Sequence, residues 1–222
     1  MSNYQSNTQQ PPKTALDDPK LALHGEPWTE GDFKNKPSLK LRYVNNNFRF
    51  TCYLSHPDEG GDAKPVNVNM TLNIANTFLS LLEAALDDPE WRMAGVENKN
   101  YDWYNQKRSD KPSVQSTASV ARDKDGVICI IITGKNRPTA VFQFLPSFWF
   151  AIKYKDGTDM SKSDVSKHVA RGWLNSVRGL MGPVAADMYK HPEPKPRNAA
   201  NDAGGRQNTA PPPAAVQTDV FM

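Results

Sequence analysis

The sequence has few cysteines, no long apolar run and no glycine-rich phosphate loop. Cysteine occurs only twice, and Cys52 and Cys129 both lie in apolar strand-like patterns, which favours buried thiols over a disulfide bond. No apolar run approaches the roughly 18 residues that a membrane span needs, and the N-terminus lacks the basic-then-apolar order of a signal peptide. We therefore expect a cytoplasmic protein without a membrane partner.

The residues that most enzymes need are also scattered or missing. No glycine-rich loop follows a strand, which argues against nucleotide hydrolysis of the familiar kind. Cys52 and His56 lie close together, but zinc takes four ligands and the others are absent. The acidic stretch 58–62 is interpreted as a solvated hairpin loop rather than a cation site. We expect no catalytic residue, no metal and no cofactor, and a metal-dependent nuclease is the least favoured alternative.

Composition divides the chain into three parts. The first 36 residues include four prolines in a polar context, and residues 193–222 are rich in Pro, Ala, Asn and Gly. Neither end can bury enough apolar surface to offset the entropy of ordering. We expect a flexible segment over 1–36, a single domain over 37–190 and a disordered tail over 191–222. The net charge of +3 permits nucleic-acid binding without requiring it.

The first of two similar units covers residues 38–88. Polar and apolar residues alternate over 39–44, 48–54 and 66–72, as in strands with one buried face. Asn73 then stands where a helix N-cap is expected, and apolar residues follow at helical spacing as far as Asp87.

The second unit, residues 113–180, repeats this order with more apolar residues. Its predicted strands cover 114–121, 127–133 and 139–145, and a helix-like apolar segment follows over 146–154. The unbroken apolar run 127–132 is typical of a central strand, and the three aromatics at 148–150 are expected in the core. A last helix is predicted over 163–180, ending before Gly182-Pro183.

This order predicts an α+β fold. Two antiparallel strand–helix units would form its sheets, with the helices packed on one side.

The outward face of the first unit carries no acidic residue. The side chains that alternate with its buried positions are Lys40, Arg42, Arg49, Thr51, Tyr53, Asn67, Asn69 and Thr71. Cations pair with phosphates, amides and hydroxyls bond sugars and bases, and an aromatic ring offers a stacking surface, which is the combination that single-strand binders use. An ordinary solvated sheet face is the alternative interpretation.

Residues 90–112 lack periodicity but are rich in aromatic and basic side chains. They contain Trp91, Arg92, Tyr101, Trp103, Tyr104, Lys107, Arg108 and Lys111. A connection of this length is uncommon in a compact domain unless it is functional or mobile. The rings would stack bases if they are exposed; alternatively, Trp91, Trp103 and Tyr104 anchor the segment to the core.

The C-terminus combines a flexible tract with an apolar tip. The last residues are Asp219, Val220, Phe221 and Met222. This tail resembles those of bacterial and phage single-stranded DNA-binding proteins, which end in acidic residues and a hydrophobic tip that recruits replication enzymes. The resemblance implies that residues 219–222 bind replication or transcription proteins.

The element order over residues 38–180 is similar to that of the Whirly fold and its relatives among single-stranded DNA-binding coactivators and phage proteins. That resemblance implies two sheets backed by helices, single-stranded DNA as the ligand, and a homo-oligomer assembled through the helices.

The leading hypothesis is a non-enzymatic single-stranded DNA-binding protein, encoded by a phage and acting in host cytoplasm in DNA replication, recombination or transcription. Phosphates would be neutralised by Lys40, Arg42, Arg49, Arg92, Lys107, Arg108 and Lys111. Bases would stack on Tyr53, Tyr101, Trp103 and Tyr104, with polar contacts from Asn67 and Asn69. The alternative is a structural or assembly protein of a virion, whose sheet faces are contact surfaces without affinity for nucleic acid.

Overall fold

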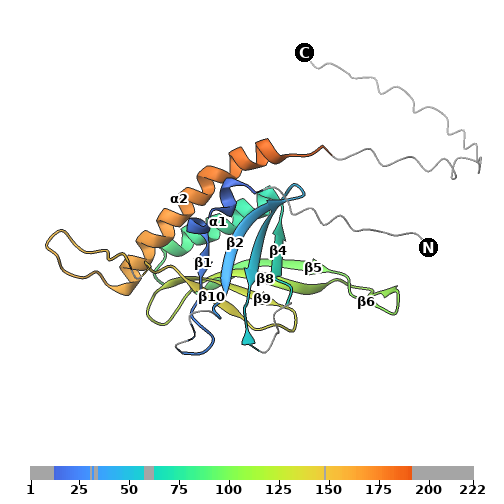
Figure 1. The fold of residues 1–222 in the computed structure, drawn as a ribbon, viewed down its shortest axis with the longest axis horizontal. Coiled ribbons are helices and arrows are strands. Elements are labelled where there is room, and N and C mark those ends of the chain that lie inside the picture. Colours follow the sequence, from blue (N-terminus) through green and yellow to red (C-terminus); the bar gives the residue numbers. More distant parts are fainter. Residues whose placement is uncertain (1–12, 31, 33–34, 58–62, 148, 192–222) are drawn as a thin grey trace, which may run out of the picture. The chain divides into compact units, whose positions relative to one another are not determined.

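The fold is α+β over the residues that the computed structural model describes, which are 13–30, 32, 35–57, 63–147 and 149–191. Two four-stranded antiparallel sheets, a two-stranded hairpin and two α-helices make up the domain (Figure 1). The expected fold class is therefore confirmed. The tip residues Asp219, Val220, Phe221 and Met222 and the acidic stretch 58–62 lie outside the described residues.

Sheet A has the strand order β1-β2-β3-β4. Its strands are β1 (Leu23–His24), β2 (Ser38–Val44), β3 (Asn47–Tyr53) and β4 (Val66–Met70). Asn45 and Asn46 join β2 to β3 with φ angles of 51° and 60°. Both angles are positive, as a tight type I′ hairpin requires, and asparagine tolerates this conformation well. The turn fixes the register of the first hairpin.

Sheet B has the order β10-β9-β8-β5. Its strands are β5 (Met93–Asn100), β8 (Ser113–Arg122), β9 (Ile128–Gly134) and β10 (Ala140–Gln143). The small hairpin of β6 (Trp103–Tyr104) and β7 (Lys107–Arg108) separates β5 from β8 in the chain and lies beyond the end of sheet B (Figure 1). Residues 90–112 are thus mostly strand, and the expected loss of regular structure there is wrong. Strand β5 is held in place by its pairing with β8, which the sequence of β5 alone does not predict.

The first helix ends at Asp87 as the sequence predicts, but its start and both ends of the second helix differ from the predicted residues. Helix α1 covers Leu72–Asp87, and its N-cap is Thr71, whose hydroxyl accepts from the amide of Ile74, rather than Asn73. Helix α2 covers Lys162–Met188 and continues through Pro183, so Gly182-Pro183 does not end it. Met181 and Val184 are buried on either side of the proline, and this packing outweighs the missing amide hydrogen bond.

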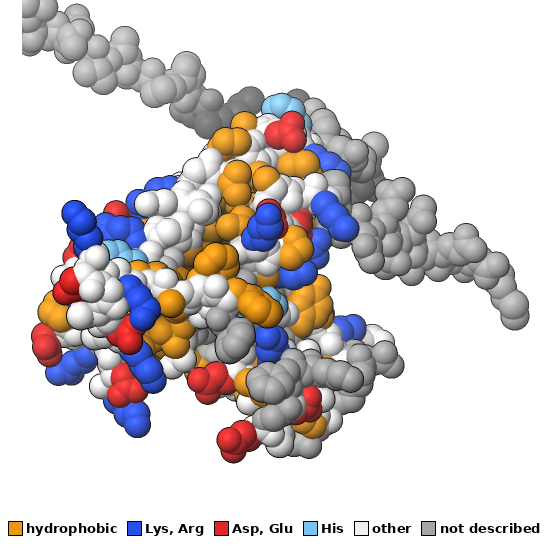
Figure 2. Space-filling model, turned by 60° about the vertical axis from the view of Figure 1, so that its left-hand side comes forward, with side chains coloured by type: hydrophobic (Ala, Val, Ile, Leu, Met, Phe, Trp, Pro, Cys, Tyr) orange, Lys and Arg blue, Asp and Glu red, His pale blue; other side chains and the backbone are white. Residues whose placement is uncertain are grey.

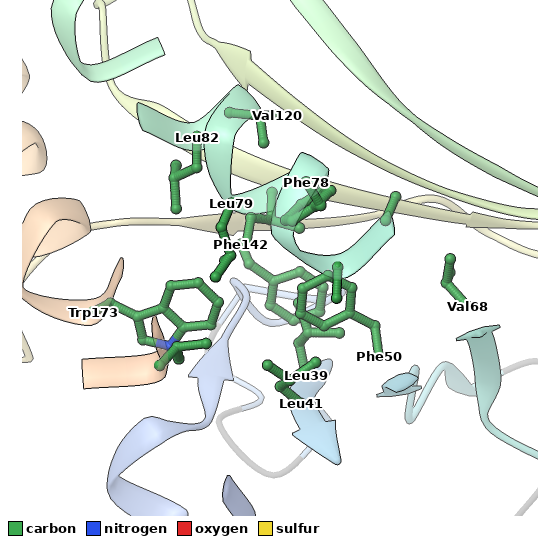
Figure 3. Close-up of a cluster of buried hydrophobic side chains, with 14 of the residues drawn as sticks. Leu39, Leu41, Phe50, Val68, Phe78, Leu79, Leu82, Val120, Phe142 and Trp173 are labelled. Atoms are coloured by element: carbon green, nitrogen blue, oxygen red, sulfur yellow. The ribbon is translucent and has the colours of Figure 1, made fainter. Parts of the chain in front are cut away.

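The core lies between the inner faces of the two sheets and the two helices (Figure 3). Phe50 of β3 meets Phe78 of α1 edge to face, with ring centroids 5.0 Å apart. Phe144, just after β10, lies 5.6 Å from the ring of Trp173 on α2. Each such ring removes a large apolar area from water and stabilises the domain by about 1.5 to 3 kcal/mol. Both cysteines are free and buried, and Cys52 belongs to this core.

Residues 15–24 contain regular structure that packs on the domain, although the sequence predicts a flexible stretch over 1–36. Two short 3-10 helices, η1 (Ala15–Asp17) and η2 (Pro19–Leu21), precede β1. Leu16 is 2% exposed, and the indole N–H of Trp173 donates to the carbonyl of Leu21 at 2.9 Å. A single buried leucine and these hydrogen bonds are enough to hold a segment whose composition looks disordered.

The segment after β10 is not helical. Residues 146–154 form turns and an isolated bridge instead, and Trp149 and Phe150 are exposed rather than buried. Phe148, between Ser147 and Trp149, lies outside the described residues. The expectation that this aromatic cluster belongs to the core is therefore wrong for Trp149 and Phe150.

Arg122 should be a main contributor to stability because its guanidinium closes the C-terminal end of α1. It donates to the carbonyls of Ala85, Asp88 and Gly126 at 2.7 to 3.2 Å. Arg122→Ala removes charge-assisted bonds and a cation at the negative end of the helix, so we expect a loss of about 2 kcal/mol or more in unfolding free energy. Urea denaturation followed by circular dichroism measures this loss.

Arg171→Ala provides the matched control. Arg171 pairs with Asp87 at the same helix end, but both side chains are more than half exposed. An exposed ion pair of this kind contributes about 1 kcal/mol or less. Equal losses for the two variants would contradict the role assigned to Arg122.

Candidate nucleic-acid interface

The strand register places the predicted residues of the first unit on one side of sheet A. Lys40 lies opposite Thr51 and Arg42 opposite Arg49 across β2 and β3. Asn67 and Asn69 of β4 continue these two rows. We call this side, with Tyr53, the sheet A face. The rows form because alternate side chains of a strand point the same way and the opposite set is buried.

The sheet A face is partly engaged in its own polar contacts. The guanidinium of Arg49 donates to the side-chain oxygen of Asn69 at 2.6 Å, which fixes its direction across the strands. Thr51 is buried beneath its neighbours, whereas Tyr53 is exposed at the end of β3. The face thus presents a ring, oriented amides and basic groups rather than a uniformly open surface.

The expectation that this face has no acidic neighbour is wrong. Helix η1 packs against β2 and brings the carboxylate of Asp17 to 2.7 Å from Nε of Arg42, with side chains 11% and 23% exposed. The expectation took account only of residues in the strands themselves. Asp17 is 25 positions away and reaches Arg42 through the tertiary packing of the N-terminal segment. Arg42 is therefore already paired with a carboxylate, which leaves it less available to an anion than the sequence predicts.

The same packing creates a basic hollow on β2. Its volume is about 840 Å³, and its walls include Lys13, Lys20, Lys40, Arg42, Tyr53 and Leu180. Two acids also line it: Asp17, which is paired with Arg42, and Asp18, whose carboxylate accepts from the backbone amide of Lys20. Three lysines thus surround the hollow. Both of its carboxylates already accept hydrogen bonds, one from Arg42 and the other from the amide of Lys20. Lys13 and Lys20 belong to the stretch that composition predicts to be flexible.

A sequence signal for this segment does exist. Thr14 and Asp17 form a reciprocal capping box, in which the threonine hydroxyl accepts from the first turn and the aspartate accepts from the amide of Thr14. Pro19 at the first position of η2 is a second helix-start signal. Together they mark an ordered start near residue 14.

The β6–β7 hairpin carries two exposed aromatic and two exposed basic residues. Trp103 and Tyr104 are 66% and 68% exposed, and they lie opposite Arg108 and Lys107 in the hairpin register. Arg108 also lies over the ring of Tyr101, with its guanidinium carbon 4.3 Å from the ring centroid. The hairpin therefore presents two open rings directly beside two cations.

Asp102 anchors the base of this hairpin. Its carboxylate accepts from Nζ of Lys135 at 2.7 and 2.8 Å, from Oγ of Ser113 at 2.7 Å and from Nε2 of Gln115 at 3.0 Å. The hydrogen bond from Lys135, followed by those from Ser113 and Gln115, lowers the pKa of Asp102 to about 2. The amide of Ser109 donates to the carbonyl of Asp102 at 2.8 Å, and the amide of Asp102 donates to Oγ of Ser109 at 3.0 Å, which closes the same junction. The hairpin thus projects from a fixed base.

The remaining predicted residues lie outside β5: Trp91 and Arg92 precede it, and Lys111 follows the hairpin. Trp91 is an anchor, because its indole N–H donates to the carbonyl of Val120 at 3.0 Å, so the alternative of a ring bound to the core is confirmed for this residue. Arg92 is exposed, but β5 is eight residues long and separates it from Tyr101 by roughly 25 to 30 Å. Lys111 is exposed after the hairpin. The structure therefore separates Arg92 from the hairpin group.

A polar contact joins the sheet A face to the hairpin side. Nδ2 of Asn98 on β5 donates to the carbonyl of Asn69 at 3.3 Å, and Oγ of Ser116 on β8 donates to the carbonyl of Asn67 at 2.6 Å. The row that begins at Arg42 and Arg49 therefore leads toward β5, the strand that ends at the hairpin. The candidate interface consists of the sheet A face with its basic hollow and the hairpin.

Within the described part of the chain, no group of three or more His, Cys, Asp or Glu side chains could hold a metal ion. Neither helix in that part is both long and apolar enough to cross a bilayer. Burial raises the pKa of the Cys129 thiol to about 11, which does not suit a nucleophile.

Comparisons with known proteins give little similarity. No protein-family model matches the chain, and no curated protein matches it. Among solved structures, a chain from crystal structures of Trypanosoma brucei MRP1/MRP2 is 12% identical, with a TM-score of 0.38 over 73% of this chain and 86% of that chain.

Loss of the Asp102 charge should loosen the hairpin. Since its pKa is lowered in the folded protein, its contribution is complete above about pH 4 and is lost as pH falls toward 2. Asp102→Asn should therefore lower the protection factors of amides in residues 100–113 at pH 5, and match the wild type near pH 2. Hydrogen exchange, corrected for intrinsic rates, measures this.

Asp110→Asn changes an exposed aspartate of the same segment and serves as the control. Its protection factors should equal those of the wild type at both pH values. If Asp102→Asn leaves the pH 5 protection unchanged, Asp102 does not hold the hairpin.

Proposed function

We propose that this protein binds single-stranded DNA without catalysing a reaction. The observation that carries the proposal is the β6–β7 hairpin, where two exposed rings stand beside two cations on a fixed base. Every base has a face that can stack on an aromatic side chain, and each stacked base contributes roughly 1 to 3 kcal/mol. Unpaired bases fit such a hairpin because, unlike those of a duplex, their faces are accessible.

The sheet A face would bind the phosphate backbone. Lys13, Lys20 and Lys40 surround the basic hollow, and Tyr53 at its rim offers a further ring. Arg42 orients the N-terminal segment through Asp17, so we assign it a supporting part in binding. Cations held around a hollow contact phosphates with little loss of side-chain freedom, which favours a sequence-tolerant, salt-sensitive complex.

The order of elements supports the same class of protein. The four antiparallel strands of sheet A precede α1, and the four of sheet B precede the loop that leads to α2. This is the order on which the resemblance to the Whirly fold and phage single-stranded DNA-binding proteins rests. We accordingly propose a phage-encoded protein that supports replication, recombination or transcription in the host cytoplasm, with residues 219–222 recruiting partner proteins and the domain self-associating through its helices.

A titration of fluorescently labelled oligo-dT tests the proposal. We expect the anisotropy of the oligonucleotide to rise on binding and the affinity to fall as salt is added, because bound phosphates release counterions. Trp103→Ala/Tyr104→Ala should weaken binding at least fivefold, the equivalent of about 1 kcal/mol for the removal of one stacked base. Lys107→Gln/Arg108→Gln should lower the salt slope by roughly 0.7 for each phosphate that the variant no longer neutralises.

Matched variants elsewhere on the surface control for nonspecific effects. Tyr189→Ala removes an exposed ring at the end of α2, and Lys155→Gln removes an exposed lysine that is outside the candidate interface. Neither should alter affinity or salt slope. Absence of any anisotropy change, together with stable oligomers in light scattering, would instead support the assembly protein and refute single-stranded DNA binding.

A further inference from the structure

A second hollow lies on the other side of η2 from the basic hollow. Its volume is about 1010 Å³, and β1, β10 and α2 contribute to its walls. Its lining is mixed and includes the aromatic and basic groups His24, Trp28, Trp149, Trp173, Lys20 and Lys36. Figure 2 shows one face of the molecule, on which hydrophobic side chains gather toward the middle and Lys and Arg side chains lie on both sides. Such a mixture suits bases and phosphates together.

The two hollows adjoin. Lys20 and Leu21 of η2 line both of them, so this short helix is the ridge between them. Two hydrogen bonds fix the position of η2. The indole N–H of Trp173 donates to the carbonyl of Leu21, and the amide of Gly25, just after β1, donates to the carbonyl of Pro37 at 3.0 Å. A ligand in the basic hollow would therefore contact η2, whose position is fixed and which carries Lys20.

The charge around the ridge favours an anion. Lys13 and Lys40 line the basic hollow, Lys36 lines the second, and Lys20 lines both. The pKa of His24 is lowered by burial first and then by the positive charges of Lys36 and Lys40. Lys36 and Lys40 line different hollows, and both lower the pKa of the same imidazole. The positive potential of the lysines therefore extends across η2 from one hollow to the other. Glu26 is the acidic residue in the lining of the second hollow.

Trp149 has a position that core packing does not explain. It is 82% exposed although it borders a hollow that contains Trp28 and Trp173, whose indole N–H groups donate to backbone carbonyls. Val141 of β10, which lines the same hollow, is also exposed. A large open ring beside a basic hollow is the arrangement already seen at the β6–β7 hairpin.

We infer that the single-stranded DNA path crosses η2 and continues into the second hollow, where Lys20 and Lys36 contact phosphates and Trp149 stacks a base. This inference rests on the proposed function and extends it, since the path beyond η2 adds a separate subsite. The subsite would be reached only by an oligonucleotide long enough to occupy the sheet A face first. It therefore predicts a dependence on length that the hairpin and the sheet A face alone do not.

Oligo-dT of about 5, 10, 15 and 20 nucleotides, which covers common single-strand site sizes, tests the subsite by anisotropy. Lys36→Gln and Trp149→Ala should each weaken binding of the longest oligonucleotide at least fivefold and leave the shortest unchanged, because both residues line only the second hollow. Lys155→Gln and Tyr189→Ala should leave binding at every length unchanged. Urea denaturation of each variant establishes that the fold is retained.

The outcomes separate this inference from the proposed function. Weaker binding by the hairpin variants, with unchanged binding of all lengths by the Lys36 and Trp149 variants, would overturn the subsite alone. Binding of no oligo-dT by the wild type would overturn both. If Trp149→Ala instead abolishes self-association in light scattering without affecting long oligo-dT, the ring is a protein contact and the subsite is refuted.

Discussion

The alternation of side chains along β2 and β3 decides both what this protein buries and what it shows to solvent. Leu39, Leu41 and Phe50 point into the core, where α1 and α2 cover them. A shift of one residue in the register would turn these apolar groups outward and bury Lys40 and Arg42 without partners, at a cost of several kcal/mol. The hydrophobic interior thus enforces the positions of the basic groups on the opposite side, although it does not contact the ligand proposed for them.

Much of the architecture can be predicted from local patterns, and the rest depends on contacts between distant residues. The three strands and the helix of the first unit lie within two residues of their expected bounds, because strand and helix periodicities are properties of short segments. Strand β5 could not be found in this way, since Glu97, Asn98 and Lys99 are poor strand formers and gain order only beside β8. Helix α2 likewise passes Pro183 because neighbouring turns are buried against the domain.

The candidate interface likewise has one part that local patterns predict and another that depends on contacts between distant residues. Periodicity predicts that Lys40, Arg49 and Asn69 share a face, and the strand register places them there. It does not predict the carboxylate of Asp17 beside Arg42, because that contact depends on where an N-terminal segment of unremarkable composition packs. Composition alone also fails to distinguish an anchoring tryptophan from an exposed one. Only the surroundings of each indole, given by tertiary structure, make that distinction.

The distribution of the five indoles has a spectroscopic consequence. Trp28, Trp91 and Trp173 donate their N–H groups to backbone carbonyls within the domain, whereas Trp103 and Trp149 are largely in water. Intrinsic emission should accordingly contain a blue-shifted component from the interior and a red-shifted one from the surface. Iodide should quench only the second of these while the protein is folded. The chain thus carries its own optical reporters, of which one set senses the integrity of the interior and the other the occupancy of its surface.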